Sequence, residues 1–547
     1  MKISFKTTAW AAVALFTINI TQVTAQELTA KPADPPKNWH TLDLKQDGFF
    51  GISLNQAYDF LKGKKSKTVV VATIDSGIDT LQKDLRPVLW ANTKEIAGNG
   101  KDDDGNGYID DLHGWNFLGG PNNKCDVNET TEEVREYFRL KNKYANITTA
   151  AAAKDKAEYA YWVKVKDVRD STVSKSQAEL DQLTPLMNAL VTTDAFIKKS
   201  LSLKAGQSFT KNDLTKLDAK NDTLSKSKYI WGLILQDADN AKTDTKTITE
   251  LSEYITKLNN DVNPDLEARK RVVGDNPDDI NDKKYGSNQL KFEDASHGTG
   301  VAGLIGAVRG NGYGIDGVAD NVKIMSIKAV PNGDEYDKDI ANAIRYAVDN
   351  GAKVVNMSFG KKISPHKKWV DDAIKYAAEK DVLLVQASGN DNQNVDVKPE
   401  FPNDNLLDGT KVDNLISVGA SGSLNDENLA ATFSNYGKNS VDVFAPGVKV
   451  TSIDKDAEFN TADGTSFASP ITAGVAALVL EYYPTLSAKQ LKEVIIASAK
   501  PLNGTNVLKP GSKEKVDFTT LSKSGGIVNA LEALKIASKM KGERKKQ

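Results

Sequence analysis

An acid, a base and a nucleophile stand in three short stretches that are far apart in the chain. Asp75 ends the run Val-Val-Val-Ala-Thr-Ile-Asp, His297 lies in Ser-His-Gly-Thr-Gly, and Ser466 lies in Gly-Thr-Ser-Phe-Ala-Ser-Pro. A serine hydroxyl attacks a carbonyl near neutral pH only when a base within hydrogen-bond reach takes its proton. An imidazole is suited to that transfer, and a carboxylate can orient the imidazole. The three side chains therefore fit nucleophilic acyl transfer, in the chain order acid, base, nucleophile.

Each of these residues also has a plainer interpretation. Asp75 can form a turn before Ser76-Gly77, His297 can be structural, and Ser466 can cap a helix. The β-branched run before Asp75, however, predicts a buried parallel strand, where an unpaired carboxylate is costly. Small apolar runs follow His297 and Ser466 and predict helices, whose N-termini present N–H groups and partial positive charge. That positive end would favour an oxyanion beside Ser466.

A fourth stretch adds a hydrogen-bond donor. Asn390 follows Ser-Gly at the end of the apolar run 382–387, which predicts another buried strand. Its side-chain amide can donate to the oxyanion of a tetrahedral intermediate. On its own, Asn390 would more simply cap a turn. Its occurrence with the other three, on strand ends and helix starts, favours a hydrolytic site.

Together these stretches resemble the subtilisin-like serine peptidases, the subtilase family. The resemblance covers about residues 66–125 and 286–532, and further stretches that carry it are 354–360, 433–437, 444–447 and 525–530. Gly300 and Ile471 stand where the family often has histidine, and Ser388 stands where a small residue is usual. The histidines that the family often has at positions 300 and 471 do not transfer protons. Their replacement by Gly300 and Ile471 therefore leaves the implied activity intact.

The resemblance implies an α/β fold of three layers, with a mostly parallel central sheet, helices on both faces and the site at the carboxyl ends of the strands. It implies a serine endopeptidase that needs no cofactor for catalysis. Ser466 would attack the peptide carbonyl, His297 would take its proton, Asp75 would hold the imidazole, and Asn390 would bind the oxyanion.

The resemblance also implies where a protein or peptide substrate binds. Ser358 and Gly360 would pair with its extended backbone as an added strand. Asp391, directly after Asn390, would lie at the mouth of the pocket for the substrate side chain. Its charge predicts a preference for basic side chains.

Residues 126–285 separate the acid from the base and differ in composition from the rest of the chain. They hold three of the 39 glycines, and their apolar residues recur with helical spacing. Such residues are Leu180, Leu183, Met187 and Leu190, and then Ile248, Leu251, Ile255 and Leu258. We expect an α-helical insertion, which could be a passive appendage or a lid or exosite beside the substrate cleft.

The remaining sequence predicts a division into further segments. Residues 1–25 have a basic start, an apolar stretch at 9–20 and the small-residue sequence Val-Thr-Ala, which are typical of a secretory signal peptide. The alternative, a membrane anchor, would need a longer apolar stretch. We therefore expect export to the periplasm or the medium. The other segments are an N-terminal segment at 26–65, the peptidase domain at 66–125 and 286–535, and a basic tail at 536–547.

The acidic loop at 102–111 predicts a calcium site. Its candidate ligands alternate as in part of an EF-hand loop, with hard oxygen atoms that suit Ca²⁺. They are Asp102, Asp104, Asn106, the Tyr108 carbonyl and Asp110. His113 stands where an EF-hand has its bidentate glutamate, so the loop is not a full EF-hand, and a solvated acidic turn is the alternative.

Composition excludes several other classes of function. The 547 residues carry a net charge of −2, which gives no electrostatic basis for a nucleic-acid partner. Cys125 is the only cysteine, so an intrachain disulfide is impossible, and a cysteine nucleophile is a weak alternative. Beyond the signal peptide, no segment predicts a membrane crossing. No pattern predicts an oligomeric state.

Two other functions remain compatible with the same residues. The chain could be a binding or scaffold protein of subtilisin fold whose proteolysis is vestigial, with the insertion as its working part. It could also be an esterase or transpeptidase, because the nucleophile does not determine which group accepts the acyl chain.

Overall fold

The computed structural model describes residues 35–219, 221–236 and 243–544. The described residues form two compact units, one of 35–127 and 266–544 and one of 128–265. The expected signal peptide lies outside the described residues. None of the helices in the described part of the chain combines the length and apolar character that a membrane crossing requires.

The first unit contains a central sheet of seven strands in the order β2-β5-β1-β6-β7-β8-β9, and every neighbouring pair is parallel. The strands are β1 (Val69–Asp75), β2 (Gly114–Asn116), β5 (Val322–Lys328), β6 (Val354–Met357), β7 (Leu383–Ala387), β8 (Leu415–Ser421) and β9 (Val443–Pro446). Their near-complete burial is typical of parallel strands that are covered on both faces. The sheet is the mostly parallel one that the sequence predicted.

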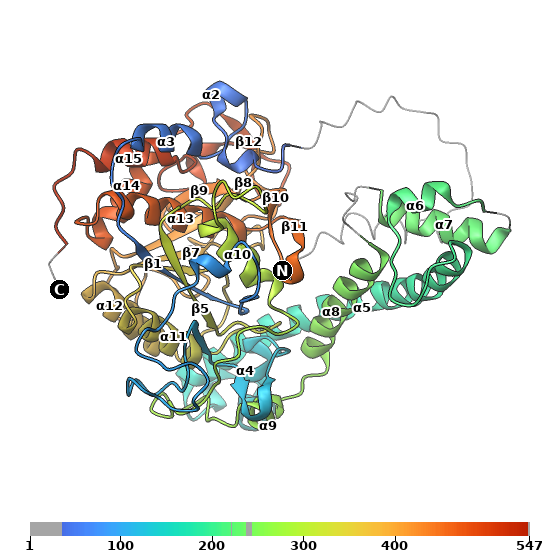
Figure 1. Ribbon diagram of the computed structural model, residues 1–547. Coiled ribbons are helices and arrows are strands. Elements are labelled where there is room, and N and C mark those ends of the chain that lie inside the picture. Colours follow the sequence, from blue (N-terminus) through green and yellow to red (C-terminus); the bar gives the residue numbers. More distant parts are fainter. Residues whose placement is uncertain (1–34, 220, 237–242, 545–547) are drawn as a thin grey trace. The chain divides into compact units, whose positions relative to one another are not determined.

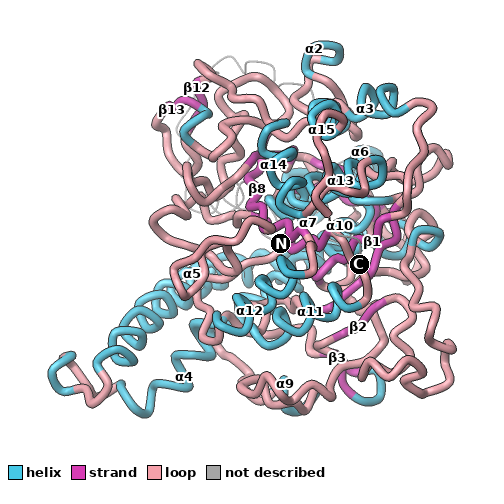
Figure 2. The backbone as a smooth tube through the Cα atoms, turned by 90° about the vertical axis from the view of Figure 1, so that its left-hand side faces the viewer, coloured by secondary structure: helices cyan, strands magenta, loops and turns pink. Residues whose placement is uncertain are grey.

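Helices cover both faces of this sheet (Figure 1). α10 (Ser296–Gly306) and α13 (Thr465–Tyr482) pack in one core with Val69 and Val71 of β1. α11 (Asp337–Asp349) and α12 (Lys367–Glu379) pack in the other core with Ala72 and Ile74. The alternation along β1 follows from the two-residue repeat of a strand. Figure 2 shows the strands between the two groups of helices, which together make three layers.

Short elements complete the first unit. Three antiparallel ribbons each have two strands, and the remaining helices lie in the terminal segments and in the stretch that follows residue 265. The elements are α2 (Leu44–Asp47), α3 (Leu54–Leu61), β3 (Gly119–Gly120), β4 (Lys124–Cys125), α9 (Ala268–Val272), β10 (Val450–Ile453), β11 (Phe459–Ala462), α14 (Ala488–Ser498), β12 (Asn506–Leu508), β13 (Lys515–Asp517) and α15 (Ala530–Ala537).

The second unit is built from helices in its described residues. They are α4 (Glu132–Tyr144), α5 (Lys156–Ser200), α6 (Lys211–Lys216), α7 (Asp222–Ile234) and α8 (Asp244–Val262). Leu180, Leu190 and Leu251 of the expected helical faces are buried in its core with Trp231. Residues 266–285 belong to the first unit. The assignment of 126–285 to one inserted domain stays a prediction.

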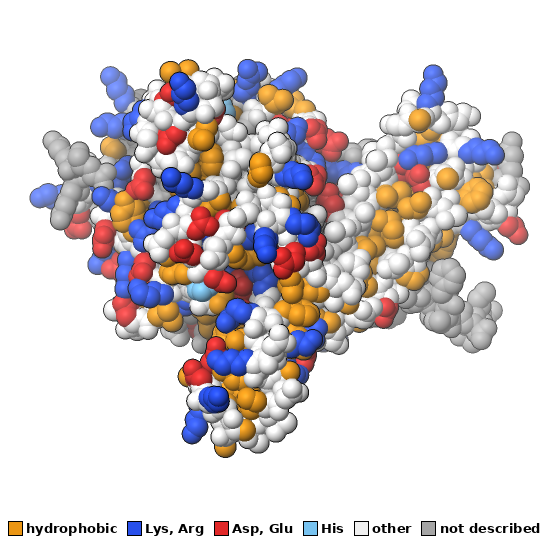
Figure 3. Space-filling view, turned by 90° about the horizontal axis from the view of Figure 1, so that it is seen from below, with side chains coloured by type: hydrophobic (Ala, Val, Ile, Leu, Met, Phe, Trp, Pro, Cys, Tyr) orange, Lys and Arg blue, Asp and Glu red, His pale blue; other side chains and the backbone are white. Residues whose placement is uncertain are grey.

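Charged groups are placed differently on the surface and in the interior. On the face seen in Figure 3, basic and acidic side chains are interspersed. Inside the first unit, the Arg269 guanidinium makes two hydrogen bonds to Asp275, each 2.8 Å, and two to Asp339, of 2.7 and 2.9 Å. The Tyr285 hydroxyl donates to Asp339 at 2.7 Å, and Lys338 Nζ donates to Asp275 at 2.7 Å. This buried cluster joins the segment after residue 265 to α11.

We predict that Arg269→Ala lowers the free energy of unfolding by about 3–5 kcal/mol, because it leaves two buried carboxylates short of a cation. Lys270→Ala is the matched control, since the neighbouring Lys270 side chain is 80% exposed, and its effect should stay within about 0.5 kcal/mol. Urea unfolding of both variants at one pH measures the difference. Equal losses in the two variants would contradict the assigned role of the cluster.

Candidate active site

The carboxyl end of β1 is the natural position for a site in this sheet. β5 and β6 flank β1 on opposite sides, so the order in which the strands are added to the sheet reverses at β1. In open α/β sheets such a switch point leaves a crevice outside the strand ends, where ligands bind. Asp75 is the last residue of β1 and therefore stands at this end of the sheet.

Asp75 and His297 are in direct contact there. His297 is the second residue of α10, and its Nδ1 lies 2.6 Å from Asp75 Oδ1, which also accepts the Ser76 N–H at 2.8 Å. Asp75 is buried, and the His297 side chain is 17% exposed. Because Nδ1 faces the carboxylate, Nε2 of a neutral imidazole is the acceptor that faces away from it.

Two glycines allow the Asp75 and His297 loops to touch. A Cβ added at Gly298 would lie 2.0 Å from the Gly77 carbonyl oxygen. Gly77 has a φ of +89°, and its own Cβ would lie 2.2 Å from the Leu290 oxygen. A side chain at either position would therefore separate the loops. Ser76 Oγ joins them, because it accepts the Gly298 N–H at 3.2 Å and donates to the Asp294 carbonyl at 2.8 Å.

A buried ion pair supports the same loops. Lys328, the last residue of β5, stands beside Asp75 in the sheet register. Its Nζ donates to the Ser76 carbonyl at 2.7 Å and pairs with the Asp294 carboxylate. Burial raises the pKa of Asp294, and the Lys328 cation opposes that shift. The sequence analysis missed this pair, although a lysine at the end of an apolar strand was a possible signal.

Ser466 lies at the start of α13, against the loop that follows β6. Its Oγ donates to the Ser358 carbonyl at 3.1 Å, and Ser358 Oγ donates to the Ser466 carbonyl at 2.9 Å. The ring of the next residue, Phe467, lies with its centroid 6.2 Å from that of His297. The starts of α10 and α13 therefore meet at the end of β1.

Asn390 is oriented by the residue before Ser466. Its Oδ1 accepts the Thr465 N–H at 2.9 Å and the Thr465 hydroxyl at 2.9 Å. Because Oδ1 is occupied, the amide Nδ2 of Asn390 faces Gly464. A Cβ added to Gly464 would lie 3.8 Å from this Nδ2. The amide N–H is thus held near Ser466. The group combines a hydroxyl, an imidazole paired with a carboxylate and an amide N–H, which are the kinds of group that acyl transfer requires.

The predicted substrate-binding residues lie around the same point. Ser358 contacts Ser466, as described above, and Gly360 follows two residues later. The Asp391 N–H donates to Asn435 Oδ1 at 3.1 Å. The structure adds Glu400, whose carboxyl lies near Gly360 and Gly389. No motif or spacing around Glu400 could have shown this contact from the sequence.

Cys125 does not fit the alternative of a cysteine nucleophile. It is half-buried, and burial raises the pKa of its thiol to about 12. The reactive form of cysteine is the thiolate. Near neutral pH the thiol is therefore protonated and unreactive.

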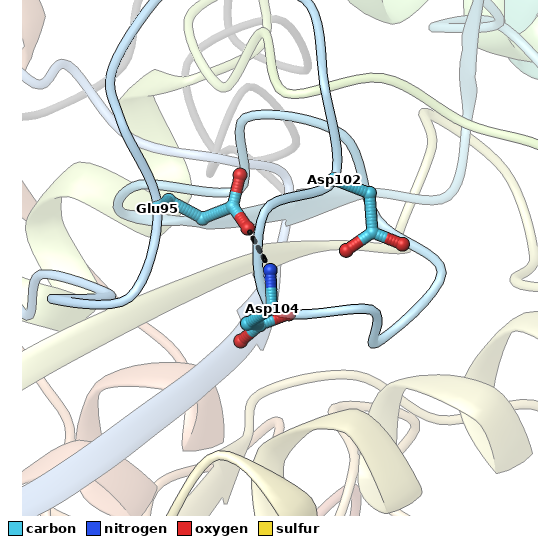
Figure 4. A group of neighbouring side chains, drawn as sticks. All are labelled: Glu95, Asp102 and Asp104. Carbon is cyan, nitrogen blue, oxygen red and sulfur yellow. Dashed lines mark hydrogen bonds between the residues drawn. The ribbon is translucent and has the colours of Figure 1, made fainter.

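The acidic loop brings together only part of the predicted metal ligands. Oxygen atoms of Glu95, Asp102 and Asp104 lie within 4.8 Å of one another (Figure 4). Glu95 Oε1 also accepts the Asp104 N–H at 3.2 Å. The sequence analysis named Asp102 and Asp104 but missed Glu95, which lies outside the motif.

Two of the other predicted ligands, Asp110 and Asn106, accept hydrogen bonds within the loop. The Asp110 carboxylate accepts the N–H groups of Asn99 and Gly100, at 3.1 and 2.8 Å. Asn106 Oδ1 accepts the Tyr108 N–H at 2.8 Å. The carboxylates that lie together are those of Glu95, Asp102 and Asp104. The wider ligand set, with Asn106, the Tyr108 carbonyl and Asp110, stays a prediction.

Comparison with known proteins agrees with this geometry. A family model described as the subtilase family (Peptidase S8) matches residues 66–520. The chain is 36% identical over 211 residues to the thermophilic serine proteinase of Bacillus sp. (strain AK1), covering 38% of this chain and 48% of that protein. It is 37% identical over 213 residues to subtilisin DY of Bacillus licheniformis, covering 38% and 71%. It is 31% identical over 230 residues to the cell wall-associated protease of Bacillus subtilis, covering 42% and 24%.

The matched part spans half or less of the first and the third of these relatives. The family match and the parallel sheet confirm the resemblance and the fold class that the sequence predicted.

Proposed function

The chain belongs to the subtilase family, and we propose that it is a serine endopeptidase that hydrolyses peptide bonds with Asp75, His297 and Ser466. The observation that carries this proposal is the 2.6 Å contact between His297 Nδ1 and Asp75 Oδ1 at the end of β1. It leaves Nε2 as the base at the point where α13 presents Ser466.

In the proposed mechanism, the Ser466 hydroxyl turns from the Ser358 carbonyl toward His297 Nε2 and attacks the substrate carbonyl as the proton moves to the imidazole. Asp75 stabilises the imidazolium that forms. His297 then passes the proton to the leaving amine, and water releases the acyl group by the reverse steps. The Asn390 amide and the Ser466 N–H bind the oxyanion. Loss of one such donor in a subtilisin costs about 10²–10³ in turnover.

Substrate binding follows from the same arrangement. The main chain of Ser358 and Gly360 pairs with the extended substrate as an added strand, which accepts many sequences because it uses backbone hydrogen bonds. The side chain next to the attacked carbonyl then lies near Asp391. Substrates are therefore proteins or peptides in extended form.

We predict that a fluorophosphonate probe labels the folded protein and that Ser466→Ala abolishes labelling, because the probe reacts only with an activated serine. Asp75→Asn should lower the labelling rate by about 10⁴, since the imidazole loses its orienting partner. Ser538→Ala, on the exposed end of α15, is the control and should label like the wild type.

Absence of labelling in folded wild-type protein would contradict the proposal. It would favour the other function considered for this fold, a binding protein with vestigial proteolysis. Gel fluorescence after timed exposure to the probe provides the measurement, with circular dichroism as the check on folding.

We further propose that Glu95, Asp102 and Asp104 hold a structural Ca²⁺. Three carboxylates within 4.8 Å of one another offer hard, anionic oxygen ligands. The ion would offset their mutual repulsion and fix the loop before β2. The alternative is an acidic turn that needs no ion.

We predict that removal of calcium with a chelator lowers the melting temperature by roughly 5 °C, because an ion present at about 100 times its Kd contributes about 2.7 kcal/mol to stability. Glu95→Gln and Asp104→Asn should remove this difference. Asp413→Asn is the control, since Asp413 is an exposed partner of Lys489. Scanning calorimetry with and without calcium is the measurement, and a wild-type curve that the chelator does not shift would contradict the site.

We also propose that the chain is exported through a signal peptide at residues 1–25. The basic start, apolar stretch and small-residue site support this, and the name of one relative places that protein at a cell wall.

We predict that expression in a bacterium that exports proteins yields a periplasmic or secreted protein that begins at Gln26, because cleavage follows the small residues Val-Thr-Ala. N-terminal sequencing of each cell fraction is the measurement. A cytoplasmic product that retains residues 1–25 would contradict it.

A further inference from the structure

One acidic side chain lies against two glycines that border the proposed site. An added Cβ at Gly389, directly before Asn390, would lie 2.3 Å from Glu400 Oε2. An added Cβ at Gly360 would lie 3.4 Å from the same oxygen. The Glu400 carboxyl therefore sits between the segment that holds the oxyanion donor and the segment that follows Ser358.

This position is where the substrate side chain must go. In the proposed binding mode, the substrate carbonyl lies at Ser466 and its oxyanion at Asn390. The substrate backbone then lies along Ser358 and Gly360. The side chain of the residue that supplies the carbonyl is directed between the two segments. Gly360 has no side chain to fill that space. Glu400 is half-buried, so the carboxyl can be reached by an entering group.

Neutral polar groups also lie beside Gly360. An added Cβ at Gly360 would lie 3.5 Å from the donor Gln386 Nε2 and 3.5 Å from the Phe401 carbonyl oxygen, which already accepts the Lys361 N–H at 3.0 Å. The Glu400 carboxyl is therefore the group beside Gly360 that can pair with a cation.

A second acid, Asp391, contacts the Glu400 carboxyl. Glu400 Oε1 accepts the Asn435 amide at 3.0 Å, and the Glu400 carboxyl is hydrogen-bonded to Asp391. Burial, with the added effect of the Asp391 charge, raises the pKa of Glu400 to about 8, and Lys362 opposes the shift. Near neutral pH the two carboxyls therefore share a proton, which a substrate cation would displace.

We propose that Glu400, together with Asp391, binds the positively charged side chain of a lysine or arginine that supplies the attacked carbonyl, so that cleavage follows basic residues. This inference rests on the proposed peptidase function. It deepens the basic preference expected from Asp391 by adding a second acid, Glu400, which lies beside Gly360 and Gly389. Glu400 acts on specificity and takes no part in proton transfer to the substrate.

The test uses three peptide 4-nitroanilides that differ only in the last residue: arginine, its neutral isostere citrulline, or leucine. The wild type should cleave the arginyl substrate with the highest kcat/KM. Glu400→Gln keeps an acceptor for Asn435 but removes the charge. It should lower kcat/KM for the arginyl substrate by about 10- to 100-fold, as for loss of a hydrogen bond to a charged group, and leave the citrullyl value nearly unchanged. Glu379→Gln, at the exposed end of α12, is the control.

The pH dependence provides a second readout that a purely structural role would not alter. Dividing the arginyl by the citrullyl kcat/KM cancels the pH dependence of the catalytic steps, which both substrates share. Because the ionised form of Glu400 binds the cation and is formed as pH rises, the ratio should rise through about pH 8 in the wild type. In Glu400→Gln the ratio should be flat.

A wild-type preference for leucine, or an arginyl-to-citrullyl ratio that Glu400→Gln leaves unchanged, overturns the proposal. Calorimetry of the arginyl and citrullyl peptides with the Ser466→Ala variant separates this failure from failure of the proposed function. Tighter binding of the arginyl peptide supports the pocket even if the wild type fails to react with the fluorophosphonate probe. Equal binding of the two peptides overturns it.

Discussion

The structure around the proposed site depends on how one buried carboxyl group, that of Asp75, is hydrogen-bonded. Asp75 lies at the end of a covered strand, where an ionised carboxyl is stable only with donors around it. The Ser76 N–H and His297 Nδ1 both reach Oδ1. The imidazole can approach so closely only because Gly77 and Gly298 carry no side chains. The same contact that stabilises the carboxylate thus fixes the base.

Strand order explains how residues 222 positions apart come to share this contact. β1 lies between β5 and β6, and all three strands are parallel. Their carboxyl ends, and the loops that follow them, therefore lie at the same edge of the sheet. α10 and α13 then begin at that edge, each with its reactive residue in second place. The chain between Asp75 and His297 can be long because the cost of closing a loop grows slowly with its length.

The sequence could predict those parts of the site that depend on local pattern. β-branched runs predicted the strands, and positions at strand ends and helix starts predicted Asp75, His297, Asn390 and Ser466 as the candidate site. Glu95 and Glu400 could not be predicted this way, because each contacts residues from outside its own local pattern. Lys328 had a local signal at the end of an apolar strand, but its partner Asp294 lies in another segment. Glu95 joins the expected Asp102 and Asp104, while Asn106 and Asp110 accept backbone N–H groups.

The side-chain pocket has a physical reason to prefer a cation over a neutral group. If Glu400 only held Asn435 in place, an uncharged amide would do so without placing two acids side by side. A carboxyl next to Asp391 must keep a proton or acquire a positive partner, because like charges at contact distance cannot both ionise cheaply. A substrate lysine or arginine is such a partner, and it arrives along Ser358 and Gly360. All of these groups belong to the first unit.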